Sequence, residues 1–285
     1  MNKHTMNEDL EKAWTFINKE FPFENYIPSA RKSSYFEMPN SVSQYQKKGA
    51  KILDFGAGSC DKTAMLSLSG FDVVAFDDFG DDWYNFKGNT KKILDFAKKA
   101  GINYIHPDED GNINFPENHY DAIILNNVVE HFHDSPHGLL STLIKSLKIG
   151  GNIFIAVPNA VNLRKRIDVV RGKTNYSPFA YYYWANPWRG HIREYVKDDL
   201  EKMGQFLELN TQEISTHHYH LDVISPFKRI VFKAICRIFP SFRESWLYVG
   251  QKTESWKERL KPNKEEFKMA FDKQYFDYKE EMFDE

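Results

Sequence analysis

The middle of the chain alternates short apolar runs with amphipathic segments. The runs that predict strands are residues 51–55, 72–76, 103–106, 121–125 and 152–157. Apolar positions at helical spacing predict the intervening helices over residues 64–68, 91–100 and 138–147. Because strands rich in Ile, Val and Phe alternate with helices, the pattern predicts βαβ units and a parallel sheet covered on both faces.

Less regular segments flank this core. Leu10, Ala13 and Ile17 share one helical face, which predicts a helix over residues 7–21. A polar stretch with prolines follows to residue 49 and separates that helix from the first strand. Residues 160–195 are rich in aromatic and basic side chains, so we expect an insertion that folds over the sheet as a lid or a substrate wall.

The C-terminal part is predicted to complete the sheet. Its expected elements are a helix over 197–207, a strand over 211–216, a basic amphipathic helix over 226–239 and a strand over 245–250. Gly150 and Gly151 are expected to end the preceding helix and to form a turn. The chain thus divides into an N-terminal helical extension (1–49), a central domain (50–251) and a charged helical tail (252–285).

Composition narrows the class of protein. The 285 residues carry a formal net charge of −2, which gives no basic field for sequence-independent binding of nucleic acid. Two cysteines, Cys60 and Cys236, are too few for a disulfide framework and indicate a reducing, cytoplasmic setting. The N-terminus has no signal-peptide pattern, and no apolar run approaches the ~20 residues that cross a bilayer, so we expect a soluble protein.

The stretch KILDFGAGS at residues 51–59 predicts a buried strand that ends in a glycine turn. Gly56 and Gly58 can adopt positive φ and carry no Cβ, so the backbone can approach a nucleotide-like ligand closely. Two glycines at such a turn can also serve packing alone. The turn lacks the lysine and spacing of a phosphate-binding loop, which argues against a kinase or ATPase.

Polar residues also follow the later strands, at the edge where open parallel sheets bind ligands. Asp77 stands 21 positions after Gly56, where a carboxylate can accept hydrogen bonds from both hydroxyls of an adenosine ribose. It could instead cap a helix. The strand phase favours Asp77 over Asp78.

Four segments resemble consecutive motifs of the class I S-adenosylmethionine-dependent methyltransferases: KILDFGAGS, VVAFDD, FPENHYDAIILNNVVEHFHD and LKIGGNIFIAVPN. The resemblance covers about residues 50–160 and extends more loosely to about 215. It is greatest to the branch that methylates small molecules and glycans, with an EH pair after the fourth strand and a PN pair after the fifth. It implies an α/β, Rossmann-like, doubly wound sheet of seven strands, mostly parallel, with an antiparallel last strand at 246–249. Residues 50–251 would then be the methyltransferase domain.

The resemblance implies S-adenosylmethionine as the cofactor. The residues that would line its methionine portion are Asp54, Gly56, Ala57 and Gly58. Asp77, with Asp78 beside it, would hold the ribose, the loop at 106–110 would lie against adenine, and Asn126 and Asn127 would face the amino-acid end. The chain departs from the family at Cys60, where a third glycine is common; we expect that position in the first turn of the following helix.

Methylation of a hydroxyl requires removal of its proton, for which histidine is the usual base near neutral pH. His131 follows Glu130 in the loop after the fourth strand, and His191 lies in the segment GHIREY. We interpret His131 or His191 as the catalytic base, with Glu130 orienting a histidine or contacting the acceptor. All three could instead be structural, as backbone-bonded histidines and a helix cap.

The aromatic insertion and the segment after it would bind the methyl acceptor, which we expect to be a small molecule, a sugar or a glycan methylated on oxygen. The candidate substrate-binding residues are Tyr182, Arg193 and Tyr195. Arg193 could anchor a phosphate or carboxylate, or pair with a neighbouring acid. Nucleic acid is not an expected acceptor.

Two further patterns carry alternatives. His217, His218 and His220 with Asp222 could bind a metal, but a polar strand edge is the simpler interpretation and the reaction requires no metal, so we expect none. Residues 226–242 mix basic and large apolar side chains and could lie on an anionic membrane, or form a crossover helix on the sheet. The helical ends could also support a homodimer.

Two other classes of function share part of this pattern. An NAD-dependent oxidoreductase would use the glycine turn and Asp77, but Asp61 occupies the third glycine position of its fingerprint. The loop NNVVEH would have no role in such an enzyme. A non-catalytic binding protein could also retain the whole fold.

Overall fold

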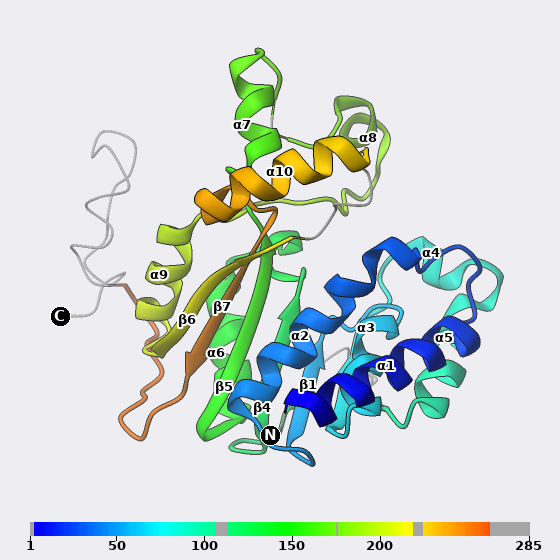
Figure 1. Ribbon diagram of the computed structural model, residues 1–285. Coiled ribbons are helices and arrows are strands. Elements are labelled where there is room, and N and C mark those ends of the chain that lie inside the picture. The colour runs from blue at the N-terminus through cyan, green and yellow to red at the C-terminus, as the bar shows by residue number, and fades with distance from the viewer. Residues whose placement is uncertain (1–2, 106–112, 175, 219–224, 263–285) are drawn as a thin grey trace.

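The computed structural model describes residues 3–105, 113–174, 176–218 and 225–262, which form a seven-stranded sheet between helices (Figure 1). The strands are β1 (Lys51–Phe55), β2 (Asp72–Phe76), β3 (Asn103–Ile105), β4 (Tyr120–Asn126), β5 (Leu147–Pro158), β6 (Asn210–His217) and β7 (Ser245–Gln251). Their order across the sheet is β3-β2-β1-β4-β5-β7-β6, and β7 runs antiparallel to both of its neighbours. The predicted α/β, doubly wound fold with an antiparallel last strand is confirmed.

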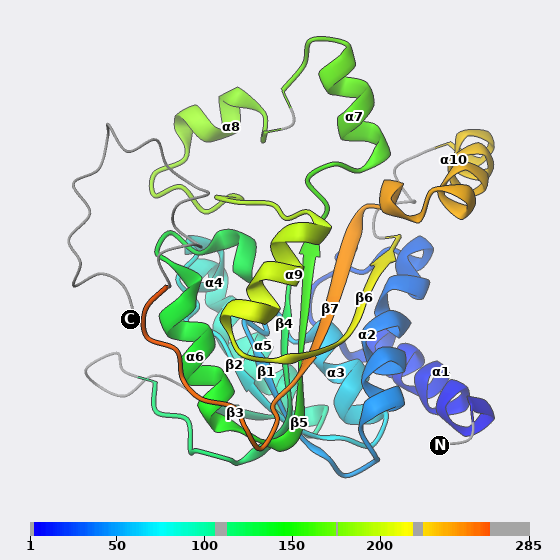
Figure 2. The ribbon, with the colours of Figure 1, turned by 90° about the vertical axis from the view of Figure 1, so that its left-hand side faces the viewer.

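Helices cover both faces of the sheet (Figure 2). The helices on one face are α1 (Lys3–Glu20), α2 (Lys32–Tyr45), α3 (Asp61–Leu68), α4 (Asp82–Asn85) and α5 (Asn89–Lys99). On the other face lie α6 (Pro136–Ser146) and α9 (Lys197–Phe206). The helices α7 (Leu163–Val170), α8 (Phe179–Trp184) and α10 (Pro226–Ile238) gather beyond the carboxyl ends of the strands (Figures 1 and 2).

The alternation of side chains along each strand builds two separate hydrophobic cores. Ala122 and Ile124 of β4 pack toward the cluster that contains α1 and α3, whereas Ile123 and Leu125 pack toward the cluster that contains α6 and α9. Because both faces are covered, the central strands consist almost wholly of apolar residues, as the sequence pattern predicts. The strands that end at the carboxyl edge of the sheet are therefore packed on both faces.

The helix α2 lies within the stretch that the sequence indicates only as a polar spacer. Its buried residues Tyr35, Met38 and Val42 recur about once per turn, and they pack on the core that α1 and α3 share. Polar residues such as Glu37, Asn40 and Ser41 lie between them, and Pro39 stands inside the helix, where proline is normally unfavourable. The N-terminal segment therefore belongs to the packed face of the sheet.

The glycine pair does not end a helix. The helix α6 ends at Ser146, and Gly150 and Gly151 lie inside β5, where the pairing with β4 jumps from Tyr120↔Leu147 to Ala122↔Asn152. Gly150 has a φ of +80°, so the glycines form an irregularity of the strand.

The expected helical tail receives no support from its described part, because residues 252–262 contain no helix or strand. The rest of the tail and the loop at 106–110 lie outside the described residues.

Candidate functional site

The glycine turn after β1 packs directly against the loop after β4. Gly56 has a φ of +76°, and a Cβ added to it would lie 2.5 Å from Cγ2 of Val128. The amides of Gly56 and Ala57 donate to the carbonyl oxygen of Phe76 at 2.8 and 2.9 Å, which ties the turn to β2. A side chain at position 56 is therefore excluded by both backbone conformation and space.

Asp77 supports the same turn from the end of β2. Its carboxylate accepts hydrogen bonds from the amides of Gly58 at 2.8 Å and of Phe79 at 2.9 Å. Burial raises the pKa of Asp77, while these two bonds act in the opposite direction. Asp78 is exposed and caps the amide of Gly80, so only the first of the two acids points toward the turn.

Cys60 lies immediately before α3, not in its first turn as expected. Its φ is +60°, in the left-handed region that favours glycine, and its side chain is fully buried. This backbone conformation explains why the resemblance leads us to expect a glycine at the position.

A cavity of about 450 Å³ lies between the two turns. Its walls include the predicted cofactor residues Asp54, Gly56, Ala57, Gly58, Asn126 and Asn127. Asp77 is not among the lining residues and acts here through Gly58.

The N-terminal segment supplies a wall of this cavity that sequence reasoning missed. Tyr26, Arg31 and Tyr35 line the cavity opposite residues of the glycine turn. The ring of Tyr26 packs against those of Phe23 and Trp83, with centroids 6.2 and 6.1 Å apart. The only sequence signal was the aromatic content of a stretch that otherwise indicates a spacer.

Asp54 is the buried acid of the cavity. The hydroxyl of Thr63 donates to its Oδ2 at 2.6 Å, and burial raises the pKa of Asp54 to about 6. The carboxyl group is therefore held in a setting that disfavours its charge until a positively charged or hydrogen-bonding ligand enters.

The structure brings the three candidate catalytic residues together. Glu130 and His131 belong to a short 3-10 helix, η3 (Val129–His131), and the rings of His131 and His191 lie 4.9 Å apart at 78°. The carbonyl oxygen of Glu130 accepts hydrogen bonds from the amides of Ile192 at 2.7 Å and Arg193 at 3.3 Å. These backbone bonds place His191 beside η3.

Each histidine is oriented through Nδ1. Nδ1 of His131 lies 3.0 Å from the carbonyl oxygen of Arg189, and Nδ1 of His191 lies 2.9 Å from Oε1 of Glu194. Lys165 forms an ion pair with the same Glu194. Burial, His131 and Lys165 lower the pKa of His191 to about 4, so its imidazole is neutral near pH 7.

The side chain of Glu130 is completely buried, and neither of its carboxylate oxygens has a hydrogen-bond partner in the described part of the chain. Burial raises the pKa of Glu130 to about 8. The alternative of a helix-capping carboxylate finds no support among the described residues, because the backbone carbonyl of Glu130, and not its side chain, accepts the hydrogen bonds from Ile192 and Arg193.

The candidate acceptor residues divide between two cavities. Tyr182 lines an aromatic cavity of about 450 Å³ together with Tyr176, Phe179, Trp188 and His191. This cavity lies in the predicted insertion, directly against one of the two histidines.

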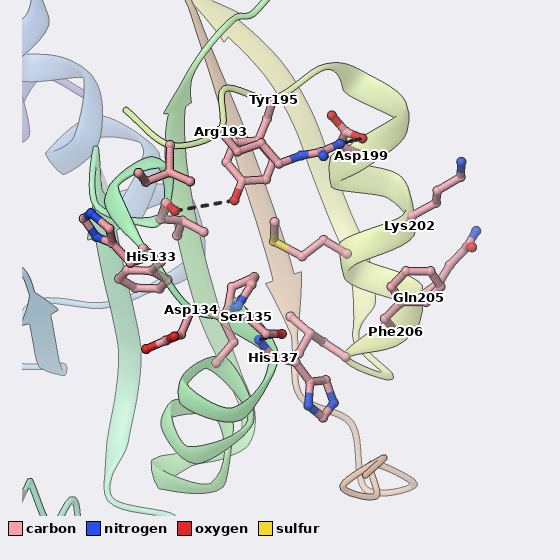
Figure 3. A pocket seen from close by; sticks show the side chains of 17 residues that line it. His133, Asp134, Ser135, His137, Arg193, Tyr195, Asp199, Lys202, Gln205 and Phe206 are labelled. Atoms are coloured by element: carbon pink, nitrogen blue, oxygen red, sulfur yellow. Dashed lines mark hydrogen bonds and ion pairs between the residues drawn. The ribbon is translucent and has the colours of Figure 1, made fainter. Parts of the chain in front are cut away.

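Arg193 and Tyr195 line a separate cavity of about 830 Å³ between η3, α6 and α9 (Figure 3). Arg193 donates to Asp199 at 2.9 Å, and Tyr195 is buried with its hydroxyl 3.5 Å from the carbonyl oxygen of Val129. Neither residue lines the aromatic cavity.

The histidines at the end of β6 have other partners. His217 lies 3.8 Å from a carboxylate oxygen of Glu37, and His218 lies 3.2 Å from one of Glu244. His220 and Asp222 lie outside the described residues.

Among the helices that the structure describes, none has the length and apolar character needed to span a bilayer.

Comparison with known proteins agrees with this geometry. The model of the family described as "Methyltransferase domain" matches residues 29–213, and the chain belongs to that family. This confirms the predictions of a class I methyltransferase and of S-adenosylmethionine as its cofactor, and decides against an NAD-dependent oxidoreductase. No curated protein matches the sequence at a significant level.

Several solved structures share the fold. A SAM-dependent methyltransferase from Archaeoglobus fulgidus is 14% identical with a TM-score of 0.50, over 84% of this chain and 99% of that one. The PH0226 protein from Pyrococcus horikoshii is 15% identical with a TM-score of 0.51 over the same shares. The 1,6-didemethyltoxoflavin-N1-methyltransferase of Burkholderia thailandensis, solved with S-adenosylhomocysteine, is 14% identical with a TM-score of 0.47, over 89% and 92%.

The contact between Gly56 and Val128 can be tested by substitution. We expect Gly56→Ala to lower the free energy of unfolding by about 2 to 4 kcal/mol, because it adds a clash to an unfavourable φ. Gly49→Ala is the matched control, since Gly49 has a φ of +80° but no atom within 4 Å of an added Cβ. Urea denaturation measures both, and equal losses would contradict the clash.

The raised pKa of Asp54 predicts a pH-dependent stability. Because the folded state holds this proton up to about pH 6 and the unfolded state only to about 3.8, stability is lost as pH rises between these values. The free energy of unfolding of Asp54→Asn should therefore rise relative to that of the wild type as the pH increases over this range, by at most about 3 kcal/mol in the ligand-free protein.

Asp121→Asn is the control of opposite sign, since Lys148 and the amide of Lys51 hold the pKa of Asp121 below its usual value despite some burial. Its loss of stability should already be present at pH 4 and stay nearly constant up to pH 7.5, because the stability that a lowered pKa contributes builds up below the unfolded value of 3.8 and is fully present above it. Urea denaturation from pH 4 to 7.5 measures both variants. A difference for Asp54→Asn that does not change with pH would show that Asp54 does not titrate in this range.

Proposed function

We propose that this methyltransferase transfers the methyl group of S-adenosylmethionine to a hydroxyl oxygen of a small-molecule or glycan acceptor. The observation that carries the proposal is the histidine pair. His131 follows the turn that lines the cofactor cavity, and His191 lines the aromatic cavity. A hydroxyl bound in the aromatic cavity would thus meet the imidazole of His191, against which the ring of His131 packs.

The cofactor would bind in the cavity between the two turns. Asp54 and the amides of the glycine turn would face the methionine portion, and Asn126 with Asn127 would face its amino-acid end. Asp77 keeps further acceptor capacity beyond its two amide bonds, which supports its assignment to the ribose hydroxyls. Asp78 points elsewhere and would act only as a neighbouring charge.

In this reaction the protein would contribute mainly by aligning the acceptor oxygen with the methyl group. The acceptor oxygen forms a bond to the methyl carbon while the carbon–sulfur bond breaks, and its electron pair remains on sulfur as S-adenosylhomocysteine. Holding oxygen and methyl carbon in line supplies several kcal/mol of the barrier reduction. His131 or His191 would take up the hydroxyl proton, and the contact of Glu194 with Nδ1 of His191 supports this role by orienting that imidazole.

The aromatic insertion supports the choice of acceptor. Tyr182 and Trp188 pack at 5.3 Å between ring centroids beside His191 and offer flat apolar faces, with the hydroxyl of Tyr182 and the indole N–H of Trp188 as polar groups. Such surfaces suit sugar rings and aromatic small molecules. Arg193 and Tyr195 would support the segment that carries His191 and would not contact this acceptor.

Two variants test the enzyme assignment. Asp77→Ala should weaken binding of S-adenosylhomocysteine by about 10- to 100-fold, because two hydrogen bonds to a carboxylate are lost. Exposed Asp78→Ala is the matched control and should change the affinity little. Calorimetric titration measures both, and equal affinity in Asp77→Ala and wild type would contradict the site.

His191→Gln should retain binding of S-adenosylhomocysteine and lose about 10²- to 10⁴-fold in turnover. The acceptor would be found by incubating the protein with labelled S-adenosylmethionine and cell extract and identifying the labelled product. Transfer only to nitrogen or to nucleic acid would overturn the proposed acceptor class.

We also propose that α10 contacts an anionic membrane. The helix buries Phe232 and Cys236 but exposes Phe227 by 76% and Ile230 by 69%. Its basic residues are Lys228, Arg229, Lys233 and Arg237. The exposed apolar side chains can insert into a bilayer, and the basic side chains among them attract anionic headgroups. The helix α7, at the same end of the molecule, also exposes Val169 and Val170 (Figure 1).

The double variant Phe227→Ser/Ile230→Ser should reduce binding to phosphatidylserine-containing vesicles at least tenfold, because two apolar side chains no longer insert. Phe206→Ser, at an exposed aromatic residue of α9, is the control and should bind like the wild type. Vesicle sedimentation measures this, and equal binding by all three proteins, or none by the wild type, would contradict the membrane contact.

We further propose a cytoplasmic location, a homodimer, and a methyltransferase domain bounded at residues 49 and 251 against which the N-terminal extension packs. The packing of α1 and α2 on α3 supports treating the N-terminal extension as part of the folded unit.

A further inference from the structure

Three side chains with metal-binding atoms meet beside the aromatic cavity. One ligand atom from each of Glu130, His131 and His191 lies within 4.8 Å of the other two. We propose that these residues bind one divalent transition-metal cation, zinc or a metal of similar ligand preference, and that the cation receives the acceptor hydroxyl. The second part rests on the proposed function, whereas the first part does not.

Glu130 is the strongest reason for a cation. Its two carboxylate oxygens are buried and have no hydrogen-bond partner within the described residues. A buried polar group without a hydrogen-bond partner costs free energy, and most buried polar atoms in proteins have a partner. A cation between Glu130 and the histidines supplies that partner without any change of the backbone.

The two histidines have the outer partners that metal-binding histidines need. The carbonyl oxygen of Arg189 can only accept, so Nδ1 of His131 donates to it and Nε2 is left with a free lone pair. Glu194 does the same for His191, and Lys165 holds Glu194 in place. Such partners fix the tautomer and the ring orientation of metal ligands.

The set of ligands selects the class of metal. Two imidazoles and one carboxylate suit zinc and neighbouring first-row metals, whereas magnesium and calcium prefer oxygen ligands. Ligands about 2.1 Å from a tetrahedral zinc ion lie roughly 3.4 Å apart. Loading would therefore draw the three side chains somewhat closer than their present limit of 4.8 Å, leaving a position open for substrate.

A cation at this place changes how the hydroxyl is activated. Coordination lowers the pKa of the acceptor hydroxyl, so its proton passes to water and the histidines remain ligands. The oxygen then forms the bond to the methyl carbon as the carbon–sulfur bond breaks. The products are the methyl ether, S-adenosylhomocysteine and one proton, and no oxidant or reductant is needed.

This inference departs from the sequence expectation that no metal site exists. The histidine cluster considered there, at His217 and His218, pairs with Glu37 and Glu244 instead. The residues that do converge are the ones interpreted as catalytic base and partner.

Metal uptake by the full chain tests the site without cofactor or acceptor. The chelator-treated protein is titrated with Zn²⁺ and separately with Co²⁺, and bound metal is counted after gel filtration by elemental analysis. We expect one ion per chain and, for Co²⁺, visible absorption bands of low-symmetry coordination. Absence of uptake by a folded protein that binds S-adenosylhomocysteine would overturn the metal proposal and leave the proposed function intact.

Variants locate the ion. Glu130→Gln keeps the shape of the side chain and should weaken Zn²⁺ binding at least 100-fold, while Glu194→Gln, which changes only an outer partner, should weaken it about 10-fold. His218→Ala is the control and should bind like the wild type. Loss of binding in His218→Ala with wild-type affinity in Glu130→Gln would move the ion to the end of β6 and overturn the assignment.

The role in methyl transfer is tested last, with an acceptor in hand. Turnover should fall at least 100-fold in the metal-free protein and return with Zn²⁺ or Mn²⁺, while affinity for S-adenosylhomocysteine stays unchanged. Full turnover without bound metal would overturn the activating role and retain the histidines as the base.

Discussion

The contact between Gly56 and Val128 is the constraint on which the site depends. The strands β1 and β4 are parallel neighbours, with Leu53 paired to Ile123, so the segments that leave their carboxyl ends are forced together. They fit because position 56 has no side chain. The cavity that we assign to the cofactor lies between these segments, and η3 with Glu130 begins one residue after Val128. A displacement of either turn would therefore move both halves of the site.

The strands and the cofactor turn could be predicted because their signals are local. A strand buried on both faces shows itself as an apolar run, and Asp77 was preferred to Asp78 from strand phase alone. The structure agrees, since Asp77 binds Gly58 and Asp78 is exposed. The helix α2 was missed because its stability comes from packing. Tyr35, Met38 and Val42 are mixed with polar residues such as Glu37 and Asn40, and a proline interrupts the pattern.

The histidine cluster shows a different limit of sequence reasoning. Glu130, His131 and His191 were each identified, but sixty positions separate the two histidines, and only the backbone bonds to the carbonyl of Glu130 bring them together. Nothing in the sequence indicates that the Glu130 carboxylate is buried with no hydrogen-bond partner among the described residues, or that Glu194 orients His191. The choice between a base and a metal ligand is a question of tertiary contacts, which local pattern does not contain.

The wall formed by Tyr26 and its neighbours has a kinetic consequence. Tyr26, Phe23 and Trp83 hold the N-terminal segment against the cofactor cavity through ring contacts, and Tyr26 itself lines that cavity. A cofactor that left past this wall would have to separate those rings first. Along that route, ring contacts at residues that take no part in transferring the methyl group would set the rate of exchange.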